Sequence, residues 1–374
     1  MSYYGPTPPP IPYGTRPEMR RPSQPSLDAS LQSLTRKNAV YYPNYRVYRG
    51  ETPATLNYNC INHVFYAFAQ VSPDGIVSLN DEWADAQMPV DGATGCIGSF
   101  MRLKQEHEYL RVILSIGGGA ASQNFARVAA HASTRDTFGR SARALIFHLT
   151  GYLVDWEHPS DHIEGQNFLS LLAAIRLYLP DNQYLLTAAL PAGQWALQNI
   201  NLYKAQDYLD LLNLMAYDFT GSWSQKAGHH AQLFAGKPGE PSSAAAVDYV
   251  ISTGFPAAKI LLGVPVYGRS FLGTSGPGHS FTGHGGEEGT FEYKYLPCAG
   301  TEEIVNTRVV GAFCHGGDGE GGWVTYDNPE TVKMKAGFCN QRGLGGLFYW
   351  TGTADVPSGP RSLVSAGFKA LHGS

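Results

Sequence analysis

Short apolar runs alternate with segments of helical spacing from residue 38 onward. The apolar runs occupy residues 39–42, 63–69, 112–118, 151–157, 184–190, 211–217, 260–268 and 345–350. Helical spacing of apolar residues is clearest in the intervening segments 100–110, 137–149, 165–179 and 242–254. Near-continuous apolar strands that alternate with amphipathic helices indicate a parallel sheet covered by helices on its outside. Eight such units predict an α/β fold, a closed (β/α)8 TIM barrel.

One interval between the apolar runs is too long for a simple loop. More than seventy residues separate the seventh run from the eighth, and they are rich in glycine and aromatic residues. A structureless loop of this length is uncommon in a compact domain. Strand-like pieces at 290–296 and 321–327 predict a small α+β insertion between barrel strands 7 and 8, where it would deepen one wall of a groove at the barrel mouth.

These features set the predicted domain boundaries. The barrel is expected at 37–271 and 326–374, and the insertion at 272–325. Residues 1–36 are rich in Pro, Ser, Tyr and Arg, which predicts a disordered or polyproline-like tail. The tail has no apolar run typical of a signal peptide, and no stretch of about 18 apolar residues occurs, so we expect no membrane partner and leave localisation open.

The alternation of side chains along residues 151–157 divides this run into two faces. One face carries Leu153, Asp155 and Glu157, and the opposite face is apolar with Tyr152, Val154 and Trp156. The apolar face suits contact with the helices, so the two carboxylates are expected inside the barrel, with Glu157 highest at the mouth. Barrel enzymes place their catalytic groups at this end of the strands.

Two other strand ends carry polar or aromatic side chains. Asn213, Met215 and Tyr217 share one face of the sixth run, and Asp218 follows at its end. The eighth run ends in Trp350, which is expected to form a flat floor or wall of the mouth. Core packing is the ordinary role of such aromatic residues, and stacking on a sugar ring is the alternative.

Composition excludes several classes of function. The chain of 374 residues is 43% hydrophobic and 16% charged, enough to bury a large core. Its formal net charge of −4 and the absence of a Lys/Arg block argue against nucleic acid as a partner. No phosphate-binding glycine motif or metal-ligand spacing is present, so we expect no metal and no cofactor. The cysteines allow at most two disulfides, and their redox state stays open; they are Cys60, Cys96, Cys298, Cys314 and Cys339.

The chain resembles glycoside hydrolase family 18, most closely its fungal and bacterial chitinases, over roughly residues 38–372. The resemblance rests on seven motifs that follow one another in the family's order. They are YAFA (66–69), SIGG (115–118), DWEHP (155–159), TAALPAG (187–193), MAYDF (215–219), GVPVYGRSF (263–271) and GLFYW (346–350).

The resemblance implies retaining hydrolysis of β-1,4-linked N-acetylglucosamine in chitin or chito-oligosaccharides, assisted by the substrate's own acetamido group. Glu157 would be the general acid and base, Asp155 would orient the acetamido group, and Tyr217 would hydrogen-bond to it. The residues expected to bind substrate are Trp350, Asp218, Met215, Tyr267, Arg269, Phe68 and Trp156. We expect an endo-acting monomer that needs no metal or organic cofactor.

The fourth strand departs from the family pattern DxxDxDxE. Its four positions are occupied by Thr150, Leu153, Asp155 and Glu157, so the first two acids are missing. The first position is mainly structural, and Thr150 can still form hydrogen bonds. Leu153 removes a carboxyl that would share a proton with Asp155, which predicts weakened rather than abolished catalysis. A chitin-binding lectin is the main alternative, and an endo-β-N-acetylglucosaminidase acting on N-glycans is another.

Overall fold

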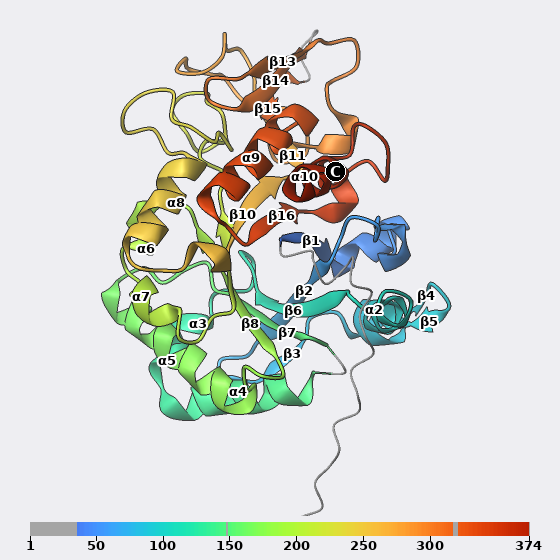
Figure 1. Ribbon diagram of the computed structural model, residues 1–374, viewed down its shortest axis with the longest axis vertical. Helices are drawn as coiled ribbons and strands as arrows, with labels where there is room; N and C mark the ends of the chain where they lie inside the picture. The colour runs from blue at the N-terminus through green and yellow to red at the C-terminus, as the bar shows by residue number, and fades with distance from the viewer. Residues whose placement is uncertain (1–35, 147–148, 317–320, 374) are drawn as a thin grey trace, which may run out of the picture.

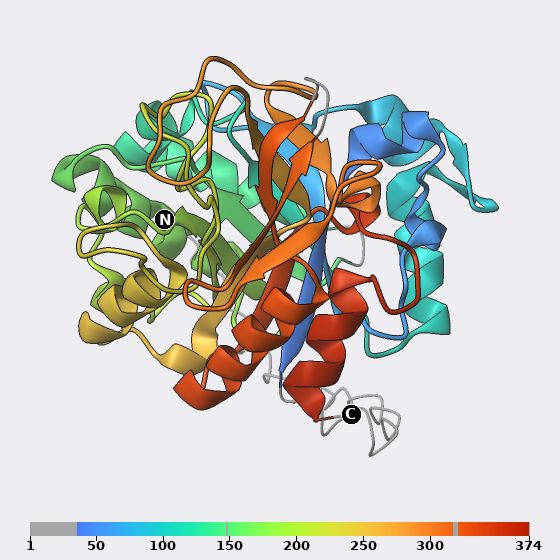
Figure 2. The same cartoon turned by 90° about the horizontal axis from the view of Figure 1, so that it is seen from above.

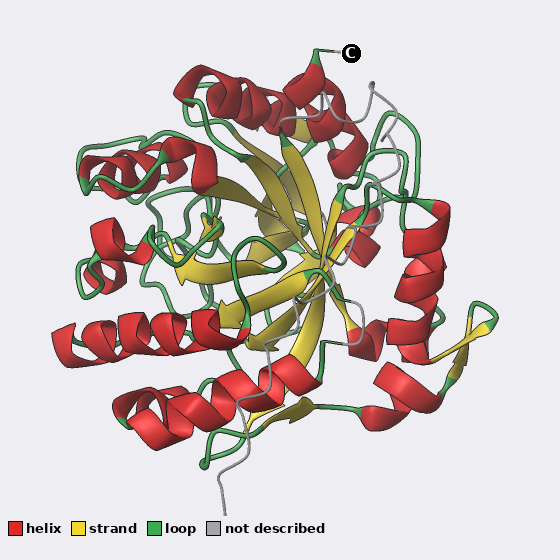
Figure 3. Cartoon of the chain, turned by 60° about the horizontal axis from the view of Figure 1, so that its bottom comes forward, coloured by secondary structure: helices red, strands yellow, loops and turns green. Residues whose placement is uncertain are grey.

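A closed barrel of eight parallel strands forms the centre of the molecule (Figure 3). The computed structural model describes residues 36–146, 149–316 and 321–373, so the predicted tail lies outside the described residues except for its last position. The strands are β1 (Lys37–Pro43), β2 (His63–Val71), β6 (Arg111–Gly117), β7 (Gly151–Asp155), β8 (Leu185–Pro191), β9 (Leu211–Met215), β10 (Ile260–Pro265) and β16 (Gly346–Trp350). They follow one another around the barrel in chain order, and the pairing of β1 with β2 and with β16 closes the ring. The eight-stranded barrel predicted from the apolar runs is confirmed.

Helices surround the barrel on its outside (Figures 1 and 3). They are α2 (Gly95–Glu106), α3 (Phe125–Ala130), α4 (Ala132–Ala144), α5 (His162–Tyr178), α6 (Gln194–Leu197), α7 (Leu202–Ala205), α8 (Ser243–Ser252), α9 (Pro329–Arg342) and α10 (Leu363–His372). Asp161 caps α5 by accepting from two backbone N–H groups of its first turn, and Asn328 and Thr331 form a capping box at α9. Local sequence therefore fixes where these two helices begin.

Smaller elements lie between the barrel strands and helices. They are the 3-10 turns η1 (Asn44–Arg49), η2 (Pro53–Thr55) and η4 (Ala257–Lys259), the π-helical turn η3 (Trp83–Gln87), and the short strands β3 (Val77–Leu79), β4 (Pro89–Val90) and β5 (Ala93–Thr94). β3 pairs antiparallel with the end of β2, and β4 pairs with β5 in a separate two-stranded ribbon.

The core consists of two layers, one on each face of the barrel sheet. The outer layer lies between strands and helices. It includes Tyr152 and Val154 of β7, and Trp156, which follows the end of that strand. The inner layer fills the lumen with apolar side chains, and Leu153 belongs to it. The predicted alternation of faces along residues 151–157 is therefore confirmed for these four side chains.

A second sheet lies at one end of the barrel, between β10 and β16 in the chain (Figures 1 and 2). Its antiparallel strands are β11 (Tyr267–Phe271), β12 (Thr290–Glu292), β13 (Glu303–Asn306), β14 (Gly311–Gly316) and β15 (Gly322–Tyr326), with the 3-10 turn η5 (Tyr293–Tyr295) between β12 and β13. Among its described residues this insertion consists of strands and short turns.

The boundary of the insertion differs from the predicted start at residue 272. Val266 N–H still donates to Trp350 O of the barrel at 2.7 Å, but β11 begins at the next residue and pairs with β12 and β15. The continuous apolar run at 260–268 hides this transfer from one sheet to the other. β11 therefore belongs to the insertion.

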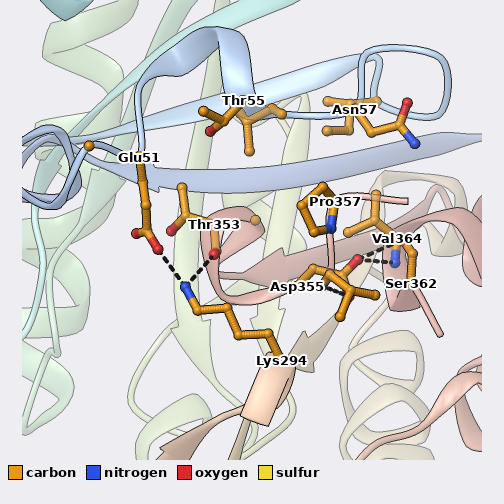
Figure 4. Close-up of a pocket in the computed structure, with 14 residues that line it drawn as sticks. Glu51, Thr55, Asn57, Lys294, Thr353, Asp355, Pro357, Ser362 and Val364 are labelled. Atoms are coloured by element: carbon orange, nitrogen blue, oxygen red, sulfur yellow. Dashed lines mark hydrogen bonds and ion pairs between the residues drawn. The ribbon is translucent and has the colours of Figure 1, made fainter. Parts of the chain in front are cut away.

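Ion pairs and hydrogen bonds attach the second sheet to the barrel. Lys294 of η5 pairs with Glu51 and with Glu292, and its ammonium group donates to Thr353 O at 3.2 Å. Lys294, Glu51 and Thr353 line a cavity of about 220 Å³ beside the barrel, where Figure 4 shows Lys294 reaching between Glu51 and Thr353. Arg361 joins Glu303 of β13 to the loop before α10 in a similar way.

Gly346 gives a test of how tightly β16 is packed against β1. It has φ of 146°, and a Cβ atom there would lie 1.9 Å from Lys37 O. Gly346→Ala should lower the free energy of unfolding by about 1–3 kcal/mol in urea titrations, because backbone on both strands must shift. Gly337→Ala is the matched control, since it lies exposed in α9 with open space around it and should stabilise by about 0.5–1 kcal/mol. Equal effects of the two substitutions would contradict this packing.

Candidate active site

Two carboxyl groups lie at the C-terminal end of β7. Asp155 is the last residue of the strand and only 3% exposed, whereas Glu157 is exposed in the mouth. Asp155 Oδ2 accepts a hydrogen bond from Ser115 Oγ at 3.3 Å, and its Oδ1 has no partner among the described residues. Ser122 Oγ donates to Asp155 O at 3.2 Å and accepts from Glu157 N–H at 2.9 Å. The backbone between the two acids is thus fixed by the loop after β6.

The glycine turn after β6 allows this loop to approach the acids. Gly117 has φ of 114°, and a Cβ atom there would lie 2.3 Å from Asp155 O. A Cβ atom on Gly118 would meet the ring of Phe68 at 2.7 Å, and one on Gly119 would lie 3.6 Å from the Glu157 carboxyl oxygens. The interpretation of SIGGG as a tight turn with a close backbone approach, rather than a phosphate site, agrees with these distances.

The pKa of each carboxyl group lies above its usual range. Burial raises the pKa of Asp155 well above its usual range, and the charge of Glu157 raises it further, against the lowering effect of the Ser115 hydrogen bond. Burial and then the charge of Asp218 raise the pKa of Glu157, while the Gly119 backbone N–H acts in the opposite direction. Water reaches the Glu157 carboxyl, but the walls around it exclude enough solvent to disfavour its charge. An acid with a raised pKa can hold a proton for a leaving group, as general acid catalysis requires.

Tyr217 and Asp218 extend from the end of β9 toward these acids. Burial, then the charges of Glu157 and Asp155, raise the pKa of Tyr217 well above its usual value, so its phenol keeps its proton and can donate. Asp218 adopts a left-handed backbone conformation with φ of 59°, which Asp tolerates better than most residues. The sequence MAYDF therefore turns the chain sharply where the strand ends.

An arginine and a tyrosine from β11 hold the Asp218 side chain. Arg269 donates from Nε and Nη2 to the two oxygens of Asp218, each at 2.7 Å, and the Tyr267 hydroxyl donates to Oδ1 at 2.7 Å. His230 Nδ1 lies 3.5 Å from the same oxygen. Burial opposes the charge of Asp218, but His230 and Arg269 hold the pKa of this carboxyl well below its usual range. Asp218 is consequently a fixed negative charge beside Glu157.

The aromatic floor of the mouth is formed by residues of three barrel strands, β1, β2 and β16. The Trp350 ring lies 5.7 Å from Phe68 and 5.1 Å from Tyr41, measured between ring centroids. Met215 contacts the same lumen cluster. Trp156 is not part of this group, because it faces outward, is nearly fully buried, and stacks on Phe125 at 5.8 Å. A residue on the helix-facing side of β7 cannot reach a ligand in the lumen.

The two positions that depart from the family pattern, Thr150 just before β7 and Leu153 within it, differ in their hydrogen bonding. Thr150 Oγ1 accepts from Val112 N–H at 3.1 Å, so the expected hydrogen bonding at this position is present. Residues 147–148, which lead into it, lie outside the described residues. Leu153 is 0% exposed among apolar lumen side chains and offers Asp155 no hydrogen bond. The site therefore lacks polar support directly beneath its buried acid.

Two cavities meet at Asp218 and together form a cleft across the mouth. One of about 750 Å³ is bounded by Met215, Tyr217, Trp195 and Trp223, and one of about 420 Å³ includes Trp350 and residues of β11 and β12. The cavity in Figure 4 contains none of the acids at the mouth.

Several residues in or next to the site did not emerge from the sequence. Trp195 and Trp223 are 63% and 60% exposed, and the Trp223 ring lies 4.5 Å from the Arg269 guanidinium. Each follows a strand-end motif within a few residues, and this position in the sequence could have indicated that both lie at the mouth. Ser115 could have been found from its place on the inward face of SIGG. His230 lies outside the MAYDF motif that contains Asp218 and carries no comparable signal.

The described residues contain no group of three or more His, Cys, Asp or Glu placed to hold a metal ion. None of the helices in the described ranges is long and apolar enough to cross a membrane. The five cysteines are free thiols.

The barrel, with an acid pair at the end of its fourth strand and an aromatic floor, defines the class of barrel glycoside hydrolases. Residues 37–355 match the family model described as "Glycosyl hydrolases family 18". The chain belongs to this family, as its seven motifs predict.

Several named chitinases are similar to this chain over most of its length. Endochitinase 1 of Metarhizium robertsii is 35% identical over 364 residues, which span 90% of this chain and 85% of that protein. Chitinase 1 of Aphanocladium album is 34% identical, across 89% and 85% of the two chains. Chitinase ChiA74 from Bacillus thuringiensis superposes with a TM-score of 0.80 at 26% identity, covering 91% of this chain and 70% of that one. The Cycas revoluta chitinase in complex with (GlcNAc)3 gives 0.78 at 25%, covering 89% and 98%.

Asp155→Asn tests the raised pKa through stability. Above about pH 4 the unfolded chain has released the Asp155 proton, whereas the folded chain still holds it. The free energy of unfolding of the wild type therefore falls as the pH rises from about 4 to the pKa of Asp155 in the folded chain. The variant cannot titrate. Its Tm should exceed that of the wild type by roughly 2–4 °C at pH 7.5, and the difference should shrink toward pH 4. Asp181→Asn, at an exposed position, is the control; a gain that is independent of pH would contradict the raised pKa.

Proposed function

We propose that this chain hydrolyses chitin and chito-oligosaccharides at β-1,4 linkages between N-acetylglucosamine units, with retention of configuration and assistance from the substrate's acetamido group. The observation that carries the proposal is Glu157, an exposed acid after the end of β7 whose pKa is raised by its surroundings and by Asp218, a residue that lines the cleft. The names of the relatives support the substrate, and so does the oligosaccharide in the Cycas revoluta complex.

In the first step the proton of Glu157 goes to the glycosidic oxygen as the bond to the anomeric carbon breaks. The acetamido oxygen of the same sugar forms the new bond to that carbon, which gives an oxazolinium ion and a free leaving chain. In the second step the Glu157 carboxylate takes a proton from water, and the water oxygen attacks the anomeric carbon as the bond from that carbon to the acetamido oxygen breaks. A positioned acid and base of this kind contributes typically 10²–10⁴-fold in rate.

Asp155 and Tyr217 act on the acetamido group. Positive charge develops on its nitrogen as the oxazolinium forms. The raised pKa of Asp155 describes the site before this charge is present. Beside the positive charge the ionised form of Asp155 is favoured, and the attraction is strong because little water screens it. Tyr217 keeps its proton and donates to the acetamido oxygen, which orients it toward the anomeric carbon. Trp350 supports the sugar face from below, next to Phe68.

The cleft suits endo action on a long chain by a monomer. Its two cavities lie on either side of Asp218, and every residue named for the reaction comes from one chain. The subsites around the bond that is cleaved are bounded by Met215, Tyr267 and Arg269. Two of these residues, Tyr267 and Arg269, also hold the Asp218 side chain in place.

A chitin-binding lectin is the second candidate, because Leu153 leaves Asp155 with one unpartnered oxygen. An unsatisfied buried group of this kind is worth on the order of 1–3 kcal/mol, and 1.4 kcal/mol is about tenfold in rate. This loss of rate is smaller than the rate gain expected from Glu157 as an intact acid and base. We therefore favour an enzyme that is slower than one with the full set of carboxyl groups.

Glu157→Gln should lower kcat on chitin oligomers by about 10²–10⁴-fold and leave their binding nearly unchanged, because the amide cannot give a proton. Chromatography of the products measures cleavage, and titration calorimetry measures binding. Glu108→Gln, at an exposed loop position before β6, is the control and should cleave like the wild type. Equal cleavage by the Glu157 variant and the wild type would refute the assignment. Tight binding without turnover by the wild type would favour the lectin.

Leu153→Asp should raise kcat up to roughly tenfold while lowering Tm, since it restores a proton-sharing partner but introduces a polar group among apolar side chains. Leu153→Asn is the matched control, because it has a similar shape and polarity but no titrating proton, and it should give the loss of Tm without the gain in rate. If a folded Leu153→Asp variant is no faster than Leu153→Asn, the missing carboxyl is not what limits the reaction.

A further inference from the structure

Two of the five cysteines lie against each other in the insertion, and neither is among the residues named for the reaction. The backbone N–H of Cys298 donates to Cys314 Sγ at 3.5 Å, which places the Cys314 sulfur directly beside Cys298. The other three have different neighbours: Cys60 contacts Ser365, Cys96 contacts the Tyr42 hydroxyl, and Cys339 contacts Gly346 O.

The surroundings fix both side chains in place. Cys298 lies in a turn closed by Thr301, whose N–H and hydroxyl both donate to Cys298 O, at 3.0 and 2.7 Å. Cys314 is fully buried in β14, where it pairs with Glu303 of β13 and Val324 of β15. A Cβ atom on Gly321 would lie 3.1 Å from Cys298 Sγ, so the glycine leaves room for this sulfur over β14 and β15.

We propose that Cys298 and Cys314 are a site of covalent modification, an intrachain disulfide that closes a ring of residues 16 apart in sequence. The oxidant is a low-molecular-weight disulfide such as oxidised glutathione. The half-buried Cys298 thiolate attacks it, releases one glutathione thiolate, and forms a mixed disulfide. The Cys314 thiolate then attacks the Cys298 sulfur and releases the second glutathione. Two protons and two electrons leave the protein, and one glutathione disulfide becomes two thiols.

The bond would stabilise the wall of the cleft. The ring contains β13, whose Glu303 binds Arg361, and it starts three residues after the end of η5, whose Lys294 binds Glu51. A cross-link restricts the unfolded chain, so it stabilises the fold when native geometry accepts it. This inference does not rest on the proposed chitin hydrolysis, and its test needs no substrate.

Reactivity should depend strongly on pH. Burial and then the neighbouring Cys314 raise the pKa of Cys298 to about 11. Only the thiolate attacks a disulfide, so below this pKa each unit of pH raises the reactive fraction roughly tenfold. Cross-linking should thus be slow at neutral pH and much faster near pH 9.

The experiment incubates the full chain with oxidised glutathione near pH 9, then counts thiols in denaturant and maps tryptic peptides. The thiol count should fall from five to three, and peptides 295–308 and 309–333 should be joined with loss of two hydrogens. The Tm of the oxidised chain should be higher than that of the reduced chain by roughly 3–6 °C.

Two variants serve as controls. Cys60→Ser should still lose two thiols, and Cys314→Ser should give only a mixed disulfide at Cys298. Retention of all five thiols by the wild type would overturn the proposal. A link through Cys60, Cys96 or Cys339, or a lower Tm after oxidation, would overturn it equally, and these results do not depend on whether a variant folds.

Discussion

A carboxyl group buried at the end of a barrel strand is the constraint on which the rest of the site depends. Asp155 has one weak hydrogen bond from Ser115, one oxygen without a partner, and the apolar Leu153 beneath it on the same face. Burying a charge in this way is unfavourable unless the charge is shared or neutralised. Asp155 and Glu157 therefore titrate as a coupled pair, and a proton remains in the site at pH values at which isolated carboxyl groups would be ionised.

The scaffold controls this pair through backbone geometry and through one fixed charge. The glycine turn after β6 brings backbone N–H groups to the acids, which bulkier residues would prevent. Asp218 keeps its negative charge because Arg269 and Tyr267 bind it from β11, a strand of the second sheet. Because that charge raises the pKa of Glu157, the insertion takes part in tuning the acid as well as in forming a wall of the cleft.

The barrel and the acid pair could be predicted because both follow from short-range patterns. Apolar runs of strand length gave the eight barrel strands, and the period of two placed Leu153 on the lumen side. The start of the insertion at Tyr267 could not be predicted, since the apolar run continues from one sheet into the next. The same period of two excludes Trp156 from the lumen, and the motif match alone had suggested otherwise. His230 and the contact between Cys298 and Cys314 depend on tertiary structure, so no local pattern reveals them.

The most direct test of the account is the configuration of the first product. Proton NMR during hydrolysis of a chito-oligosaccharide, recorded before mutarotation, distinguishes the anomers at the new reducing end. Attack by the acetamido oxygen followed by water inverts the anomeric carbon twice, so the account predicts the β-anomer as the initial product. An initial α-anomer would mean that water attacks directly, with Asp155 and Glu157 acting as an inverting acid and base, and would contradict the central claim.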